Sequence, residues 1–217
     1  MYNLPHPSQL LTNPPVKNSF KTLVRKHVIG YWESLLRKEA EPLTSLAYFK
    51  PVYMSISSPH RLWASAGSSP SKIAMATVQA VMLSGRYRTE ALCSHWSKNR
   101  KGICLLSPLC ANTVEDLPHI LSICPALSHS RHKLLQYTRE YSSKLPDNLK
   151  SLLLQNCSPS NPTFSNFLLD CSTFPAVISI VQLLGAQALD HLFSVTRTWV
   201  HVIHRERMKL LGRWNPI

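Results

Sequence analysis

Three cysteines and one histidine lie close together in the segment GICLLSPLCANTVEDLPHILSICPAL, residues 102–127. The pattern is C-x5-C, eight intervening residues, then H-x4-C, and its members are Cys104, Cys110, His119 and Cys124. Thiolate sulfur and imidazole nitrogen are the ligands of tetrahedral zinc sites in proteins. Pro108 suits a tight turn that returns Cys110 toward Cys104. The segment therefore predicts a structural zinc (Zn²⁺) site, and the alternative is that the cysteines are small buried side chains and the histidine a hydrogen-bonded polar group.

The spacing of the last two candidate ligands constrains the backbone between them. On a continuous α-helix, His119 and Cys124 would point about 140° apart and could not face one metal ion. The helix must therefore end between them, and Pro125 supplies the reason, because it disfavours a helical conformation at Cys124. Upstream, Asp116 is expected to cap the helical turn, and Pro118 is tolerated in its first turn.

Other cysteines and histidines offer further interpretations. Three disulfide bonds from the six cysteines would require an oxidising compartment, which the sequence does not indicate. Cys157 and Cys171 stand apart among apolar residues, which indicates core packing. Alternate metal donors near the segment are Cys93, His95, His129 and His132.

Helical periodicity of apolar residues runs through most of the chain. It predicts an amphipathic helix over FKTLVRKHVIGYWESLLRKEA, capped at Asn18 or Ser19, and a helix over SKIAMATVQAVMLSGR that stops at Gly85. A short helix, TEALCSHWS, is expected to be capped by Thr89. Beyond Pro125, helices are predicted over SHSRHKLLQYTREYSSKL and DNLKSLLLQN, and the apolar region PAVISIVQLLGAQALDHLFSVTRTWVHVIHRERMKLLGRW predicts one kinked helix or two helices meeting at Gly185.

No segment shows a convincing alternation of apolar and polar residues, so the predicted class is mainly α. We expect an irregular helical domain with a small embedded CCHC zinc knuckle and no substantial sheet. Aromatic side chains are expected to anchor the Pro- and Ser-rich connector over 42–71: Tyr48, Phe49, Tyr53 and Trp63. The predicted divisions are a proline-rich leader or linker over 1–17, an N-terminal helix and connector over 18–71, a helix with the zinc-knuckle segment over 72–135, and a C-terminal helical region over 136–217.

Charge is the strongest global signal. The 217 residues include 24 Lys and Arg against 11 Asp and Glu, which gives a formal net charge of +13. Such a charge favours association with polyanions, of which nucleic acid is the commonest and an acidic membrane surface the rival. No run of about 18 apolar residues predicts a membrane span, and the N-terminus has no secretory signal pattern. We therefore expect a cytoplasmic or nuclear chain that is not secreted.

The segment MLSGRYRTEALCSHWSKNRKGICLLSPLCANTVEDLPHILSICPAL resembles the region after the polymerase in LINE-type (non-LTR) retrotransposon reverse transcriptases of animals. The flanks YWESLLRKEAEPLTSLAYFKPVYMS and TRTWVHVIHRERMKLLGRW are similar to the parts before and after that CCHC knuckle, so the resemblance runs from about residue 18 onward. The turn LLSPLC, which leads from Cys104 to Cys110, is longer than the corresponding turn in many members of that family. The resemblance implies an accessory region that holds the element's RNA or the target DNA, next to an upstream reverse transcriptase domain.

Catalytic patterns are missing from the sequence. A polymerase site needs an aromatic-x-Asp-Asp turn, and this chain has no Asp-Asp pair. Glu115-Asp116 is the sole adjacent acidic pair, and there is no P-loop or G-x-S-x-G motif. We therefore expect neither an enzyme nor a small-molecule substrate.

Basic residues before and after the knuckle are candidates for contacts with nucleic-acid phosphates: Arg86, Arg88, Lys98, Arg100, Lys101, Arg131 and Lys133. Tyr87 or Trp96 would then stack on an unpaired base, although for Trp96 packing against the helix TEALCSHW is the favoured interpretation. A second hypothesis makes the chain a zinc-stabilised scaffold that docks on a polymerase. Under that hypothesis, the apolar face of residues 174–211 stays partly exposed when the chain is alone.

Overall fold

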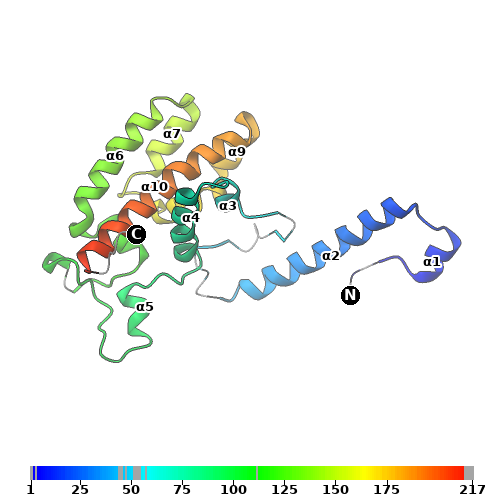
Figure 1. Ribbon diagram of the computed structural model, residues 1–217, viewed down its shortest axis with the longest axis horizontal. Helices are drawn as coiled ribbons and strands as arrows, with labels where there is room; N and C mark the ends of the chain where they lie inside the picture. Colours follow the sequence, from blue (N-terminus) through cyan, green and yellow to red (C-terminus); the bar gives the residue numbers. More distant parts are fainter. Residues whose placement is uncertain are drawn as a thin grey trace.

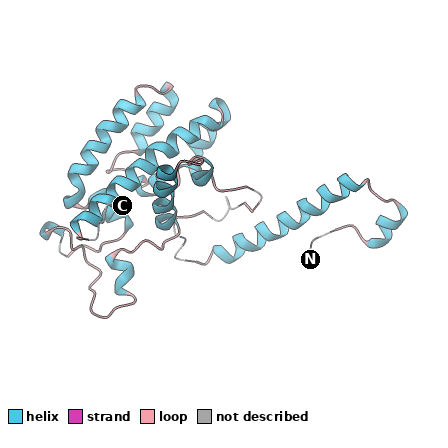
Figure 2. Cartoon of the chain, viewed as in Figure 1, coloured by secondary structure: helices cyan, strands magenta, loops and turns pink. Residues whose placement is uncertain are grey.

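A long amphipathic helix, α10 (Ala186–Leu210), runs through the centre of the helical bundle (Figure 1). The computed structural model describes residues 2, 4–43, 46, 48–50, 55–56, 58–110 and 112–212, so the expected anchor Tyr53 lies outside the described residues. Helices dominate this part of the chain, and the sole β-structure in it is one isolated antiparallel bridge between Ile103 and Val114 (Figure 2). The predicted mainly α class without a substantial sheet is confirmed.

The core forms where other helices pack against α10. These are α4 (Pro70–Leu83), α6 (Ser128–Ser142), α8 (Phe164–Leu169) and α9 (Pro175–Leu184), and α7 (Asp147–Asn156) lies beside α6 (Figure 1). Trp199 of α10 is fully buried, meets the ring of Phe164 edge to face, and donates its indole N–H to the Thr138 hydroxyl at 2.8 Å. The polar end of the indole is thus satisfied inside an apolar core, as a buried tryptophan requires.

The predicted helix boundaries agree well with the structure after residue 70. Gly85 follows α4 with φ of 68°, and Gly185 separates α9 from α10 with φ of 81°. Both angles lie in the left-handed region that glycine adopts without strain, so the chain ends one helix at each position. Of the two interpretations of the C-terminal region, the one with two helices is correct. The short helix α5 (Glu90–Ser94) is capped as expected, because the Thr89 hydroxyl accepts the Leu92 N–H at 3.0 Å.

The N-terminal helix extends away from the bundle (Figure 1). It is α2 (Lys17–Ala40), and Ala40 is its sole buried residue. The helix begins at Lys17 without a side-chain cap, so the expected cap at Asn18 or Ser19 is wrong. The Glu33 carboxylate of α2 accepts hydrogen bonds from the Ser55 hydroxyl at 2.8 Å and from the Ile56 N–H at 3.1 Å. The amphipathic pattern thus predicted the helix correctly, but the apolar side of α2 stays largely outside the core.

Short helices complete the described chain. The segment expected to be an extended leader contains α1 (Pro7–Thr12), and the connector contains α3 (Arg61–Ala64). Single 3₁₀ turns lie at Pro108–Cys110, Pro125–Leu127 and Cys171–Thr173, and one π turn lies at His119–Ile123. No helix among the described residues is both long enough and apolar enough to cross a membrane.

Candidate metal centre

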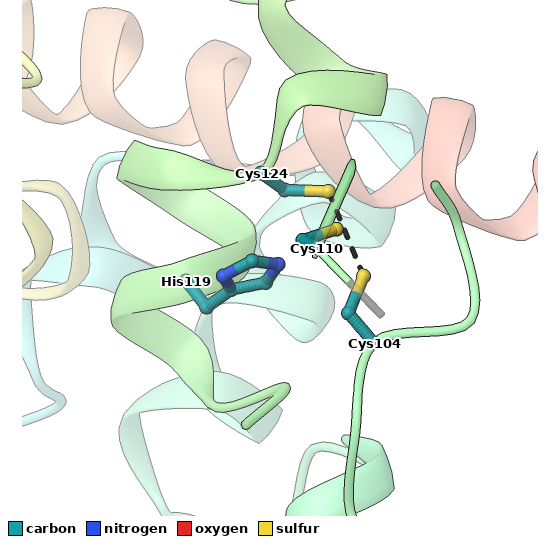
Figure 3. A group of neighbouring side chains, drawn as sticks. All are labelled: Cys104, Cys110, His119 and Cys124. Atoms are coloured by element: carbon teal, nitrogen blue, oxygen red, sulfur yellow. Dashed lines mark hydrogen bonds between the residues drawn. The ribbon is translucent and has the colours of Figure 1, made fainter. Parts of the chain in front are cut away.

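The structure brings the four predicted ligands together in one buried cluster. The Sγ atoms of Cys104, Cys110 and Cys124 and a ring nitrogen of His119 all lie within 4.8 Å of one another. Figure 3 shows the three sulfur atoms grouped together, with the imidazole ring directed toward them. Each of the four residues is buried. This is the sole group of metal-binding side chains of this size in the described part of the chain.

A short hairpin-like loop carries the first two cysteines. The Cys104 N–H donates to the Thr113 carbonyl at 2.9 Å, and the Glu115 N–H donates to the Gly102 carbonyl at 3.0 Å. Gly102 has φ of 72°, and a Cβ there would lie 3.0 Å from the Ser94 Oγ, so a side chain at this position would be strained and crowded. These contacts fix the two ends of the loop, at Gly102 and Glu115, with Gly102 packed closely against helix α5.

The turn after Cys104 folds the chain back as Pro108 predicts. It is a 3₁₀ turn over Pro108–Cys110, in which the Cys110 N–H donates to the Ser107 carbonyl at 3.2 Å. The Thr113 N–H then donates to the Cys110 carbonyl at 2.9 Å. The long spacing of five residues between the two cysteines is therefore absorbed by one compact turn, and Cys104 remains beside the other three donors.

A π turn explains how the last two donors meet. The Asp116 carboxylate caps its start by accepting the His119 N–H at 2.8 Å, as expected. The Cys124 N–H donates to the His119 carbonyl at 2.8 Å, which is an i→i+5 bond. Such a turn is wider than an α turn, so residue 124 comes back over residue 119. The helical turn ends at Ile123 and Cys124 has ψ of 119°, so the predicted break before Pro125 is also present.

The chemistry of the cluster fits a metal ion. Neither ring nitrogen of the buried His119 has a hydrogen-bond partner among the described residues, which is costly for a buried imidazole unless a ligand supplies the missing contact. The Sγ atoms of Cys104 and Cys124 are 3.8 Å apart. Zinc–sulfur bonds of about 2.3 Å at a tetrahedral angle would place two sulfur atoms about 3.8 Å apart. The cluster could therefore hold an ion such as zinc with little rearrangement.

Burial sets the protonation of these donors. It raises the pKa of Cys104 to about 12 and also raises the pKa of Cys124, since a thiolate is unfavourable in an apolar environment. Burial likewise lowers the pKa of His119, which outweighs the opposing charges of Asp116 and Glu115. The imidazole is therefore neutral and has a lone pair for a metal at neutral pH. Binding of a metal to the cysteines would displace their protons.

The alternate donors do not join the cluster. Cys93 lies half-buried in α5, and His95 is exposed just after that helix. His129 and His132 are exposed on α6. Cys157 and Cys171 are buried in the apolar core, as expected for packing residues.

Arg131 lies under the metal centre and not on the surface. Its side chain is buried, and one guanidinium nitrogen donates a very short hydrogen bond to the Cys124 carbonyl. This contact holds the backbone of a candidate ligand from the first turns of α6. The expectation that Arg131 contacts nucleic-acid phosphates is therefore wrong, because its guanidinium is turned inward.

A buried ion pair connects the zinc-knuckle segment to α10. Arg207 Nη2 lies 2.5 Å from Glu115 Oε1, and both side chains are buried. The same carboxylate oxygen accepts the Glu90 N–H at 3.0 Å, and Arg207 Nη2 also donates to the Arg88 carbonyl at 3.1 Å. The guanidinium lies over the ring of Tyr87, 5.3 Å from its centroid. Glu115 thus joins the knuckle loop, the start of α5 and the end of α10.

His204 makes this junction sensitive to acid. Burial lowers its pKa to about 4 from the usual 6.5, with contributions from the charges of His201 and Arg207, and its Nδ1 lies 2.9 Å from the Tyr87 hydroxyl. The unfolded chain therefore takes up this proton at a higher pH than the folded chain does, so protonation favours unfolding. We expect the contribution of His204 to be complete above about pH 6.5 and to be lost between about pH 6.5 and 4. Because the side chain is only partly buried, solvent screens part of the effect, and the free energy of unfolding should fall by about 1 to 2 kcal/mol.

Chemical denaturation at several pH values would measure this effect. The matched variant is His204→Gln, which keeps a polar partner for Tyr87 but does not titrate. Loss of any bound metal in acid would affect the wild type and His204→Gln alike. The difference between their curves of unfolding free energy against pH therefore reports the titration of His204. Curves that stay parallel from pH 7 to 4.5 would contradict the prediction.

The remaining basic candidates lie before and after α5 in the sequence, except Lys133. Arg86, Arg88, Lys98 and Lys101 are exposed, and Lys133 is exposed on α6. Arg100 is partly exposed, and its Nη1 lies 2.9 Å from Glu90 Oε1. Tyr87 is buried beneath Arg207, so it is not accessible for stacking on a base. Trp96 is 72% exposed, so the interpretation in which it packs into the core is wrong.

Fold and site together define an all-helical protein with a buried Cys₃His cluster that is consistent with an embedded zinc site. Comparison of the chain with protein-family models, with curated proteins and with solved structures gave no match.

Proposed function

We propose that the chain is a non-catalytic, zinc-stabilised nucleic-acid-binding module that serves as an accessory region of a retrotransposon reverse transcriptase, where it holds element RNA or target DNA. The observation that carries the proposal is the buried Cys₃His cluster, whose segment is flanked in the sequence by exposed basic side chains. Four protein donors would close the coordination sphere of zinc, which is typical of structural sites, whereas catalytic sites keep one position open to water.

The role of the metal follows from the size of the loop. Within residues 102–110 and 112–115, the loop has a single β-bridge and one 3₁₀ turn, which is too little structure to be stable alone. Zinc bound by Cys104, Cys110, His119 and Cys124 would fix this loop against the π turn, and the basic side chains that follow and precede the segment would then be held in one arrangement. The link to a reverse transcriptase rests on the sequence resemblance.

Ionic strength provides the test of phosphate contacts. The logarithm of the affinity for a nucleic acid should fall linearly with the logarithm of salt concentration, because bound phosphates release counterions. We expect Lys101→Ala to reduce this slope by about 1. Lys144→Ala is the matched control, because Lys144 is exposed beyond the end of α6 and should leave the slope unchanged.

Fluorescence anisotropy with a labelled oligonucleotide at four or more salt concentrations gives both slopes. Affinity that does not change between low and physiological salt would refute the phosphate contacts. Equal salt slopes for Lys101→Ala and Lys144→Ala would mean that Lys101 does not contact a phosphate and that the nucleic acid binds another surface of the chain.

The alternative function, a zinc-stabilised scaffold that docks on a polymerase, has its own supporting observation. An exposed aliphatic side chain lies next to each of the three cysteines in sequence: Leu105 (63%), Leu109 (83%) and Ile123 (62%). In the C-terminal region α10 is largely buried, whereas Leu183 of α9 is 68% exposed. Docking through apolar side chains would persist at high salt, which distinguishes it from phosphate binding.

A further inference from the structure

An open cavity of about 390 Å³ lies beside α5. Its walls come from the residues before, within and after that helix: Arg88, Cys93, Trp96, Ser97 and Arg100. The volume is at the lower end of the range for small-ligand sites, roughly 300–1,000 Å³. The cavity therefore has room for one small flat group rather than for a large ligand.

The walls of this cavity are positioned by contacts outside it. Helix α5 is capped by Thr89, and the Trp96 N–H donates to the Cys93 carbonyl at 3.2 Å. Arg207 donates to the Arg88 carbonyl from within the buried ion-pair network. Arg100 is fixed by its 2.9 Å contact with Glu90. The backbone around the cavity is thus held in place before any ligand binds, which reduces the entropic cost of binding.

Two kinds of side chain meet at the cavity. The Trp96 ring is largely in water, although an indole of this size is usually buried, and it offers a flat apolar face. No carboxylate of the described residues pairs with the exposed Arg88 guanidinium. An aromatic face beside a free guanidinium matches a ligand with a flat ring and an attached anion.

We propose that this cavity binds one unpaired nucleobase of a single-stranded nucleic acid, with the base stacked on Trp96 and the adjacent phosphate contacted by Arg88. The proposal rests on the proposed nucleic-acid-binding function and narrows it. Base–aromatic stacking does not depend on the identity of the base. A duplex hides the faces of its bases, so it would lose the contact with Trp96 and keep only the phosphate contacts.

Four probes of about ten nucleotides separate these contacts. They are an oligouridylate, an oligothymidylate, a duplex, and an abasic strand that has the same phosphates without bases. Using the full zinc-loaded chain, we expect Trp96→Ala to weaken binding to the first two probes by roughly 5- to 100-fold and to change binding to the other two by less than about 2-fold. A difference between the first two probes distinguishes RNA from DNA.

Variants at related positions control for loss of structure. Trp96→Phe keeps a flat aromatic ring and should retain most of the affinity for single strands. Trp32→Ala removes another exposed tryptophan, which lies on α2 and does not line the cavity, and should have no effect. Zinc content and helical circular dichroism are expected to be unchanged in all three variants.

Each outcome bears on one proposal. Equal weakening on the single strands, the duplex and the abasic strand would overturn the stacking site, and so would an unchanged affinity of Trp96→Ala for single strands. In both of these cases the wild-type chain still binds nucleic acid, so the proposed function stands. If the wild-type chain binds none of the four probes, the proposed function fails and the stacking site fails with it.

Discussion

Chelation of the metal should unfold the knuckle segment, residues 102–127, while the helices around α10 keep most of their structure. The reason is that the loop carrying Cys104 and Cys110 has little regular structure of its own, and without a metal His119 keeps two unpartnered ring nitrogens in an apolar environment. Structural zinc contributes its binding energy directly to folding, on the order of 10 kcal/mol in small zinc-binding peptides. The effect should therefore be the largest that any single treatment produces.

Two measurements check this expectation. Native mass spectrometry should show one zinc ion per chain before chelation and none afterwards. Amide hydrogen exchange should then show loss of protection within residues 102–127 and retained protection at the centre of α10, where Trp199 and Ile203 are fully buried. A metal-free protein in which the knuckle segment stays protected would rule out a structural role for zinc.

Histidine variants test the choice of ligand. His119→Ala should lower zinc affinity by at least about 100-fold, since it removes one of four ligands. His95→Ala is the matched control, because His95 is exposed outside the cluster and should leave affinity unchanged. The reverse order of effects would mean that His95 and not His119 is the ligand.

Local signals in the sequence predicted most of the candidate site. Cysteine and histidine spacing identified the four donors that converge, and the proline after Cys124 correctly predicted the end of the helical turn. The π turn itself was not predicted, because no residue pattern in the segment distinguishes it from an α turn. The separation of about 140° between His119 and Cys124 holds for an α-helix, and the wider i→i+5 turn brings the two residues closer together. Cap residues such as Thr89 and Asp116 were predictable, since capping uses neighbours in the sequence.

Contacts between distant residues account for what the sequence did not predict. Arg131 has the sequence features of a surface cation near a metal site, and only the packed α6 shows that its guanidinium contacts the Cys124 carbonyl. The apolar periodicity of α2 predicted a helix, but periodicity does not specify what the apolar side contacts. In the sequence, Glu115 is distinguished only as the neighbour of Asp116, whereas its partner Arg207 lies 92 residues away. No local pattern indicates such a pair.

Arg207→Met should strongly lower the stability of the fold, because it breaks the buried Glu115–Arg207 pair. The substitution keeps much of the side-chain volume but leaves the buried Glu115 carboxylate without its positive partner. Removal of one member of a buried ion pair typically costs about 3 to 5 kcal/mol, because the remaining charge has lost both water and its counter-ion. We therefore expect the free energy of unfolding to fall by that amount in denaturant titrations of the zinc-loaded chain.

Arg205→Met is the matched control on the same helix. Arg205 pairs with Glu206 at 3.7 Å in a partly exposed position, so its loss should cost less than about 1 kcal/mol. Similar losses for the two arginine variants would show that the Glu115–Arg207 pair has no special role.

A double-mutant cycle separates the charge effect from lost packing. Glu115→Gln removes the negative charge but keeps an acceptor oxygen for the Glu90 N–H. Combined with Arg207→Met, it should restore part of the stability lost in the single variant, because no unpaired buried charge remains. If the two losses are instead additive, the two side chains are not energetically coupled. A strong coupling would mean that the metal-binding loop and the C-terminal helix are stabilised as one unit, since Glu115 is the last residue of the loop and Arg207 lies near the end of α10.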